Sequence, residues 1–469
     1  MLKNTTKSLE EYSNKELCRF ITCGSVDDGK STLIGRILYD LQEVFEDQLN
    51  ALKKESKKYG TQSGEIDFAL LVDGLSSERE QGITIDVAYR YFSTKKRKFI
   101  IADTPGHEQY TRNMVVGASN ADIAVILVDA RNGILKQTNR HSYIAALLGV
   151  KQFIVAINKM DLVNFNEEIF NNICNEYSKI VSFLPNYDSI TINFIPLSAL
   201  KGDNILNKSQ NMLWYRGKTL LELLDSLPII EQEKDEFILP VQYVNRPHLD
   251  YRAFCGGIIS GKVKIGDEVV ALPSMQKNYV KSIIDTRNID VNHNKHTNVG
   301  ESCVSSAVSL ILQDEMDVSR GDVIASVKNT LCISDVFRAM VVWMSEKDLI
   351  LEGNYLIKIA TSYANCWIES VDFQKDINNL KEISGDTLKL NDIGGCKIRV
   401  NRRLVLQKYK ENKELGSFMI VDKYTNETIA IGLIFEILEE IKQREYTETE
   451  RGLNAYIREN FPEWECKKI

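Results

Sequence analysis

The first half of the chain alternates short apolar runs with amphipathic stretches. Uninterrupted apolar runs of this length, separated by stretches with helical periodicity, are typical of buried parallel strands that crossover helices connect. The pattern therefore predicts an α/β domain over residues 17–232. The apolar runs occupy residues 20–23, 99–102, 123–128, 153–157 and 194–197.

The second half of the chain has a different pattern, in which short alternating runs are separated by turn signals. Gly266-Asp267 and Gly321-Asp322 lie between β-branched runs, as hairpin turns do. We therefore predict two small antiparallel β-barrels, over residues 236–329 and 332–437. Residues 438–469 return to helical periodicity and predict a short helical tail. The clearest strand patterns in this half occupy residues 337–343, 355–359, 397–406 and 418–421.

Composition narrows the class of protein. The 469 residues are 43% hydrophobic and 26% charged, as in ordinary globular proteins, and the net charge is −7. No long basic run offers a footprint for a nucleic-acid backbone, and no apolar run could span a bilayer. The N-terminus is polar, unlike a signal peptide, and the nine cysteines form no C-x-x-C pair. We therefore expect a cytoplasmic protein with no nucleic-acid or membrane partner.

A glycine-rich loop follows the first apolar run and is the strongest motif in the chain. It matches G-x-x-x-x-G-K-[ST], and a predicted helix over residues 32–39 follows it. Its backbone N–H groups can cradle phosphate oxygens at the positive end of that helix. Lys30 would reach the β- and γ-phosphates, and the Ser31 hydroxyl would ligate Mg²⁺. The expected phosphate-binding residues are Gly24, Ser25, Val26, Asp27, Asp28, Gly29, Lys30, Ser31, Thr32 and, further along the chain, Gly106.

A second stretch, from Gly256 to Gly261 followed by Lys262, reads almost the same way. The next residue is Val263, which has no hydroxyl to bind magnesium, and the flanking residues alternate like strands. We therefore interpret this stretch as a β-turn between strands and not as a phosphate site.

Asp103-Thr104-Pro105-Gly106 follows the second apolar run. An aspartate at a strand end facing the phosphate loop is placed to hold the Mg²⁺ shell, and Gly106 can bring its N–H to a γ-phosphate. His107 comes next, where GTPases place the residue that orients the attacking water, so we assign it the catalytic role. Ligand-like partners are not evident for the remaining histidines, His141, His248, His293 and His296.

Thr84 lies between these two motifs. A threonine at this place can ligate Mg²⁺ only while a γ-phosphate is present, so its segment would order with GTP and loosen after hydrolysis. The alternative is an ordinary strand threonine. The predicted switch residues are Gly82, Ile83, Thr84, Ile85, Asp86, Asp103, Thr104 and Pro105, and the predicted Mg²⁺ ligands are Ser31, Thr84 and Asp103.

Asn158-Lys159-Met160-Asp161 ends another apolar run and predicts guanine recognition. The Asp161 carboxylate can accept from the guanine ring N–H and from the exocyclic amine, a pair that adenine lacks. The alternative is a polar strand end without a ligand. The backbone of the segment after the next run could contact the base oxygen. The expected guanine-binding residues are Asn158, Lys159, Asp161, Ser198, Ala199 and Leu200.

These motifs stand in the order of GTPases, and their details resemble one family. The Pro-Gly-His at 105–107 and the Gly-Ile-Thr at 82–84 resemble translation-factor GTPases, and residues 211–215 and 219–222 resemble the elongation factor 1-alpha branch. Three further stretches are similar to the large, GTPase subunit of sulfate adenylyltransferase. They are residues 24–36, residues 73–75 with 78–92, and residues 314–322.

The resemblance covers roughly residues 17–432 and implies an α/β P-loop GTPase domain, two antiparallel β-barrels and a short helical tail. It implies Mg²⁺ with GTP, and a small ATP-binding catalytic subunit as partner. That subunit would make adenosine 5′-phosphosulfate and pyrophosphate from ATP and sulfate, and GTP hydrolysis on this chain would promote the reaction. Only one complete P-loop is present, so the adenylylsulfate kinase fused to some relatives is not expected.

Two other functions stay open, and so do two local features. The chain could be a translation factor carrying aminoacyl-tRNA, or a sulfation-pathway scaffold with weak GTPase activity.

Asp27 would lie close to the phosphates, so it either holds a monovalent cation or turns its carboxylate to solvent. The tail carries an apolar stripe that either packs on its own barrel, which we favour, or docks on the partner. The stripe consists of Leu453, Tyr456, Ile457, Phe461 and Trp464.

Overall fold

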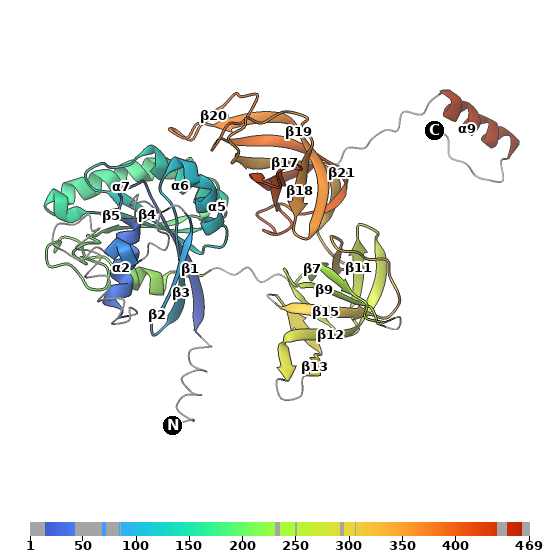
Figure 1. Ribbon diagram of the computed structural model, residues 1–469, viewed down its shortest axis with the longest axis horizontal. Helices are drawn as coiled ribbons and strands as arrows, with labels where there is room; N and C mark the ends of the chain where they lie inside the picture. The colour runs from blue at the N-terminus through green and yellow to red at the C-terminus, as the bar shows by residue number, and fades with distance from the viewer. Residues whose placement is uncertain are drawn as a thin grey trace.

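A computed structural model of the chain describes residues 15–42, 68–71, 84, 86–229, 235–248, 251–290, 295–304, 306–438 and 448–461 (Figure 1). It contains an α/β domain, two β-barrels and a C-terminal helix, which is the predicted fold class. We propose that the four parts of the chain comprise residues 17–232, 236–329, 332–437 and 438–469. In the described part of the chain, no helix is long and apolar enough to cross a membrane.

The first sheet has six strands in the order β2-β3-β1-β4-β5-β6. Five of them run parallel and coincide with the five apolar runs of the sequence, the last of which extends one residue beyond β6, whereas β2 is an antiparallel edge strand. Strand β2 was not predicted because Tyr89 and Tyr91 are exposed, which leaves no continuous apolar run. The strands are β1 (Glu16–Cys23), β2 (Ala88–Ser93), β3 (Arg97–Asp103), β4 (Ile123–Asp129), β5 (Gln152–Asn158) and β6 (Thr191–Pro196).

Helices cover both faces of this sheet. One hydrophobic cluster joins the sheet to α5, α6 and α7, and a second joins it to α2 and α8. All seven residues of β4 and of β5 are buried, as expected for strands covered on both faces. The helices are α2 (Lys30–Asp40), α5 (Thr111–Ser119), α6 (Lys136–Leu147), α7 (Glu167–Val181) and α8 (Leu220–Ser226). Short 3₁₀ helices are η1 (Phe68–Leu71), η2 (Glu108–Tyr110), η3 (Met160–Val163) and η4 (Tyr187–Ser189).

The first barrel, β7 to β16, is antiparallel and follows the order β7-β16-β11-β12-β15-β9-β8. A bridge between Ile238 and Ser260 closes it. Its strands are β7 (Ile238–Pro240), β8 (Tyr243–Asn245), β9 (Ala253–Gly257), β11 (Glu268–Leu272), β12 (Gln276–Asp290), β13 (Lys295–Asn298), β15 (Ala307–Leu312) and β16 (Val323–Ser326), with a separate pair β10 (Lys262–Lys264) and β14 (Glu301–Cys303).

The second barrel, β17 to β23, is also antiparallel. Its order is β18-β22-β23-β17-β21-β19-β20, and pairing of β18 with β19 closes the ring. The strand patterns predicted here are confirmed. The strands are β17 (Cys332–Trp343), β18 (Tyr355–Ile359), β19 (Ser362–Lys375), β20 (Glu382–Ile383), β21 (Ile393–Leu406), β22 (Ser417–Val421) and β23 (Thr428–Leu438).

The two predicted hairpins of the first barrel are wrong, although both turns exist. Gly266 and Gly321 have φ angles of 92° and 99°, a conformation that favours glycine. Gly266 joins β10 to β11, but β10 pairs with β14 and β11 with β12 and β16. Likewise, β15 and β16 flank Gly321 without pairing to each other. Turn residues specify the local bend, whereas closure of the barrel decides which strands become neighbours.

The second P-loop-like stretch connects two strands, which confirms the predicted strands on either side of it. Gly256 belongs to β9 and Lys262 to β10, so a strand follows the stretch in place of a helix. It therefore lacks the helix N-terminus that a phosphate loop requires.

The predicted apolar stripe on and after the C-terminal helix α9 (Glu448–Asn460) is largely exposed, and of its described residues only Ile457 is half-buried. Leu453 and Tyr456 are each 58% exposed, and Phe461 is 37% exposed. The favoured packing of this stripe on its own barrel is therefore wrong for these side chains. Trp464, the last residue of the stripe, lies outside the described residues.

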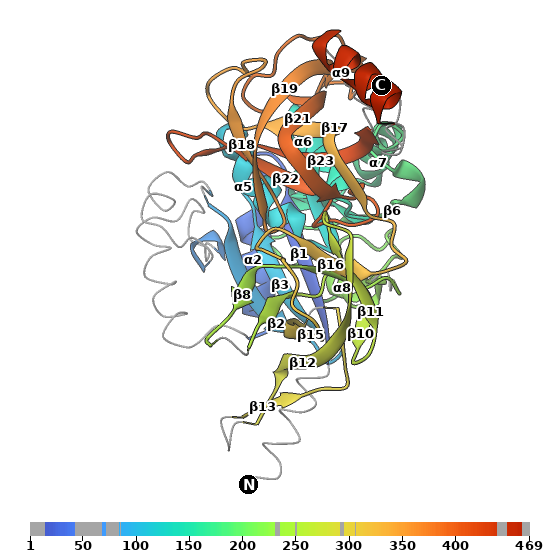
Figure 2. The same ribbon diagram turned by 90° about the vertical axis from the view of Figure 1, so that its right-hand side faces the viewer.

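The second barrel packs on the first domain, and both views place it beside α5 and α6 (Figure 2). Their apolar side chains form one continuous cluster, with Val342, Met344 and Ile393 from the barrel and Tyr143 from α6. Hydrogen bonds between the two domains reinforce this interface. Tyr409 Oη donates to the Leu148 carbonyl at 2.8 Å, and Asn139 Nδ2 donates to the Asn378 carbonyl at 3.2 Å.

Candidate GTP-binding site

The phosphate loop connects β1 to α2 at the carboxyl edge of the parallel strands. Gly29 has a φ of 90°, and a Cβ there would lie 2.5 Å from Asn158 Nδ2. A Cβ at Gly24 would lie 2.7 Å from the Leu127 carbonyl oxygen. Only glycine fits at these two positions, because each combines a positive φ with a close neighbour.

Two charged side chains stabilise this loop from inside. The Ser25 N–H donates to Asp28 Oδ2 at 2.5 Å, and burial raises the pKa of Asp28 to about 6. Lys30 is buried, and its Nζ donates to the carbonyl oxygens of Ser25 at 2.7 Å and Gly24 at 3.2 Å. Burial lowers the pKa of Lys30. A Cβ on Gly106 would collide with Lys30 Nζ and lie 2.8 Å from Val26 N, so Gly106 sits directly against the loop.

The three predicted Mg²⁺ ligands come together although they lie far apart in sequence. Ser31 Oγ donates to Asp103 Oδ2 at 2.8 Å and lies 3.2 Å from Thr84 Oγ1. Thr22 Oγ1 donates to Asp103 Oδ1 at 3.1 Å and so orients the carboxylate. Hydroxyl and carboxylate oxygens are the donors that Mg²⁺ prefers, so this set fits the ion. Sequence reasoning missed Thr22, because a threonine within a buried strand carries no motif.

Hydrogen bonds connect the predicted guanine motif to the phosphate loop. Asn158 Nδ2 donates to the Asp28 carbonyl at 2.7 Å, and Asn158 Oδ1 accepts from the Ala199 N–H at 2.9 Å. Lys159 Nζ donates to the Asp27 carbonyl and lies 3.1 Å from Asp129 Oδ2. The motif therefore joins three loops at the carboxyl edge of the sheet.

Asp129 is a further member of this site that sequence reasoning missed. It ends β4, and Arg131 Nη2 lies 2.7 Å from its Oδ2. Burial alone would raise the pKa of Asp129, but the bonds from Arg131 and Lys159 outweigh it and lower the pKa to about 2. A buried carboxylate that stays charged can hold the Lys159 ammonium in place.

The remaining predicted residues occupy the same edge. Thr104 Oγ1 donates to the Thr22 carbonyl at 2.6 Å and is buried, which makes it a structural link between β1 and β3. The Leu200 carbonyl accepts from Arg36 Nη1 at 2.9 Å. Thr32 is half-buried in α2, Pro105 and Ser198 are buried, Asp161 is half-buried, Val26 and Asp86 are exposed, and Gly82, Ile83 and Ile85 lie outside the described residues.

His107 follows Gly106 directly and is the N-cap of η2. Its ring is half-buried, and its Nδ1 accepts a hydrogen bond from the Gln109 N–H at 3.3 Å. The ring centroid lies 6.0 Å from that of Tyr110. Because Nδ1 is engaged by the backbone, Nε2 is the ring atom left to contact a water molecule.

His141, set aside by sequence reasoning, proves to have a partner in the phosphate loop. It lies on α6 and is fully buried, and its Nδ1 accepts from the Gly24 N–H at 3.2 Å. Burial, helped by the charges of Lys30 and Arg140, lowers its pKa to about 3, so the ring stays neutral. Only the packing of α6 behind the loop reveals this contact, because residues 24 and 141 are far apart in sequence.

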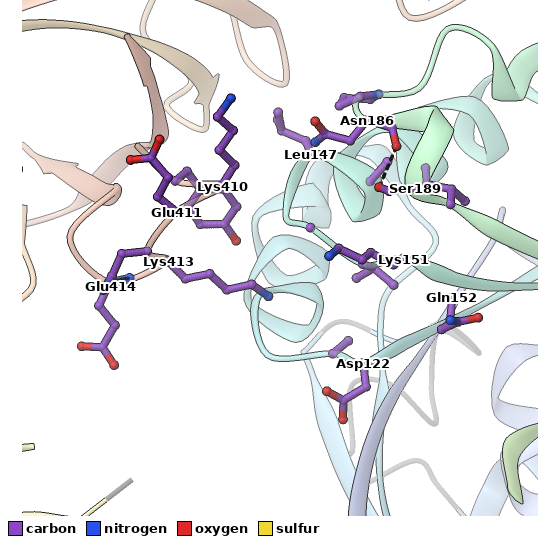
Figure 3. A pocket seen from close by; sticks show the side chains of 18 of the residues that line it. Asp122, Leu147, Lys151, Gln152, Asn186, Ser189, Lys410, Glu411, Lys413 and Glu414 are labelled. Atoms are coloured by element: carbon purple, nitrogen blue, oxygen red, sulfur yellow. Dashed lines mark hydrogen bonds between the residues drawn. The ribbon is translucent and has the colours of Figure 1, made fainter. Parts of the chain in front are cut away.

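A separate cavity of about 590 Å³ lies where the two barrels meet the first domain (Figure 3). The second barrel lines it with the loop from Lys410 to Glu414, and Figure 3 shows the Lys413 side chain extending toward the first domain. None of the predicted phosphate- or guanine-binding residues lines this cavity. It is therefore distinct from the GTP site.

Comparison with known proteins agrees with this geometry. The family model described as the elongation factor Tu GTP binding domain matches residues 15–229, and the model described as GTP-eEF1A C-terminal domain-like matches residues 336–435. The solved structure of sup35 complexed with GDP is 22% identical, with a TM-score of 0.41 over 91% of this chain and 95% of that chain. The match of the GTP-binding-domain model over residues 15–229, together with the fold, defines a GTPase of the elongation factor Tu class.

Two relatives identify the branch of this class. Sulfate adenylyltransferase subunit 1 of Sulfurovum sp. (strain NBC37-1) is 50% identical, with 98% of this chain and 97% of the relative covered. The protein of the same name from Cellvibrio japonicus (strain Ueda107) is 49% identical, with 97% of this chain and 95% of the relative covered. The chain belongs to the sulfate adenylyltransferase subunit 1 family.

Proposed function

We propose that this chain binds and hydrolyses GTP to promote sulfate activation on a separate subunit. A small ATP-binding catalytic subunit would make adenosine 5′-phosphosulfate and pyrophosphate from ATP and sulfate. The observation that carries the GTPase part is the convergence of Ser31, Thr84 and Asp103 beside a phosphate loop that Asn158 links to the guanine motif. The names of the relatives support the sulfate-activating part.

Each group of site residues would contact a different part of the bound GTP and its ion. Backbone N–H groups of the phosphate loop and of Gly106 would bind the β- and γ-phosphates, and Lys30 would turn from the loop carbonyls to the phosphates. Ser31, Thr84 and Asp103 would hold Mg²⁺, directly or through water, and the ion would neutralise charge on the phosphates. His107 would orient the attacking water, and Asp161 would select guanine.

Thr84 gives the site its dependence on the γ-phosphate. It lies 3.2 Å from Ser31 Oγ, and its segment would stay in place while GTP and the ion are bound. Loss of the γ-phosphate would release Thr84 and Gly106 together, which is a conformational change that a partner could sense. This is the coupling that we propose between GTP hydrolysis and the small subunit.

A monovalent cation beside Asp27 belongs to the proposal as well. Asp27 is exposed with a φ of 66°, so its carboxylate has access to solvent and to ions. A cation there would reduce the repulsion between the carboxylate and the phosphates. Equal hydrolysis rates in potassium and in a bulky organic cation would argue against this ion.

The proposed role of His107 can be tested in the complex with the small subunit. His107→Ala should leave GTP affinity near that of the parent and slow GTP hydrolysis about 10²-fold or more, because a positioned catalytic group is lost. Synthesis of adenylylsulfate should slow with it. His248→Ala is a matched control, since His248 is exposed on the first barrel. Unchanged GTP turnover in His107→Ala would refute the role.

A further inference from the structure

Glu108, the residue directly after His107, is held from two different parts of the chain. Its Oε1 accepts a hydrogen bond from Arg140 Nη2 of α6 at 2.6 Å. Its backbone carbonyl accepts from Asn391 Nδ2 of the second barrel at 2.9 Å. Glu108 thus joins the catalytic loop, α6 and the second barrel at one point.

The Arg140 side chain is buried in the first domain, whereas the Glu108 side chain lies partly at the surface. The Arg140 side chain is 4% exposed and that of Glu108 is 48% exposed. Arg140 Nη1 donates to Gln137 Oε1 at 3.0 Å, which fixes the guanidinium on α6. Burial alone would raise the pKa of Glu108, but Arg140 outweighs it and the pKa lies below its usual range. The carboxylate therefore stays charged and is held by a rigid partner.

Asn391 is fixed equally firmly to the barrel. It is 4% exposed, has a φ of 68°, and its N–H donates to the Trp343 carbonyl at 2.8 Å. Trp343 ends β17, and Asn391 lies just before β21, so the amide belongs to the barrel's own framework. Its bond to the Glu108 carbonyl can form only while the barrel occupies its present position on the first domain.

The contacts of Glu108 restrict the position of its neighbour His107. One peptide group joins His107 to Glu108, the residue that Arg140 and Asn391 hold in place. On the His107 side chain, Nδ1 accepts a hydrogen bond from the Gln109 N–H at 3.3 Å. Anchoring Glu108 at both its side chain and its carbonyl therefore limits how far the His107 ring can move. A catalytic group displaced by about 1 Å can lose a large part of its effect on the rate.

We propose that Arg140 and Asn391 are positioning residues that hold His107 in place through Glu108. The position of the second barrel on the first domain then sets the rate of GTP hydrolysis. The inference rests on the proposed role of His107. It adds a route by which anything that shifts the second barrel, including a bound partner, changes GTP turnover without touching the nucleotide.

Asn391→Gly tests the link with little strain, because glycine accepts the positive φ and removes only the amide. In the complex with the small subunit, GTP turnover should fall about tenfold while KM for GTP and the affinity for GDP stay unchanged. Asn426→Gly is the matched control, since Asn426 has a φ of 59° in an exposed turn of the same barrel. In a His107→Ala background, Asn391→Gly should cause no further loss.

A second variant guards against misfolding. Asn391→Asp keeps the size of the side chain but faces the Glu108 carbonyl with oxygen, and should slow turnover at least as much as Asn391→Gly. The outcomes separate the two proposals. Normal turnover in both Asn391 variants, with slow turnover in His107→Ala, would overturn this inference alone. Normal turnover in His107→Ala would overturn the proposed catalytic role and the inference with it.

Discussion

Asn158 and Asp28 are joined by a hydrogen bond of 2.7 Å from the Asn158 side-chain amide to the Asp28 carbonyl. The bond runs between the end of β5 and the phosphate loop, so the two halves of the nucleotide site cannot move independently. The other end of the same amide accepts from the Ala199 N–H at 2.9 Å. A single side chain therefore links the loops that follow β1, β5 and β6.

This arrangement predicts the effect of Asn158→Ala. The substitution leaves two buried backbone groups without their partners, at a cost of about 1–3 kcal/mol each. GTP and GDP should both bind about 10- to 100-fold more weakly, which equilibrium binding of a fluorescent guanine nucleotide would measure. Asn172→Ala, at an exposed position of α7, is the control. Unchanged affinity for both nucleotides would show that the link does not support binding.

Guanine selectivity should depend on Asp161. Asp161→Asn replaces one acceptor with a donor, so the variant should lose affinity for GTP and gain preference for xanthine nucleotides, which present a carbonyl there. Competition between GTP and xanthosine triphosphate for the purified chain measures this preference. Asp188→Asn, exposed in η4, should behave like the parent. Tight GTP binding by Asp161→Asn would refute this reading of the motif.

His141 predicts a pH dependence of stability. Its pKa of about 3 lies below the ordinary value near 6.5, so below pH 6.5 the unfolded chain takes up a proton that the folded chain does not. Stability is therefore complete above this pH and falls by about 1.4 kcal/mol per unit as the pH drops toward 3. His141→Gln, neutral at every pH, should remove this part of the slope.

Urea unfolding at pH 7 and pH 5 makes the comparison. Relative to His141→Gln, the parent should lose about 2 kcal/mol of unfolding free energy between the two pH values. His248→Gln serves as control, because His248 is exposed. Parallel pH dependence in the parent and in His141→Gln would contradict the burial of a neutral histidine behind Gly24.

Sequence reasoning reaches the elements and motifs that local patterns encode. The apolar runs within β4 and β5 mark buried strands, and the motifs at the strand ends were enough to assign Ser31 and Asp103 to one Mg²⁺ ion. What it misses depends on tertiary packing. The partners of Gly266 in the barrel, the contact of His141 with Gly24 and the bond from Asn391 to Glu108 join segments whose spacing carries no signal.

The division of labour between two subunits is the central claim, and pyrophosphate release from ATP and sulfate tests it most directly. The purified chain should release none, because its one complete P-loop is coupled to a guanine-reading motif. With the small subunit added, release should appear and should rise with GTP, but not with a non-hydrolysable GTP analogue. Sustained ATP- and sulfate-dependent pyrophosphate release by this chain in isolation would contradict the account.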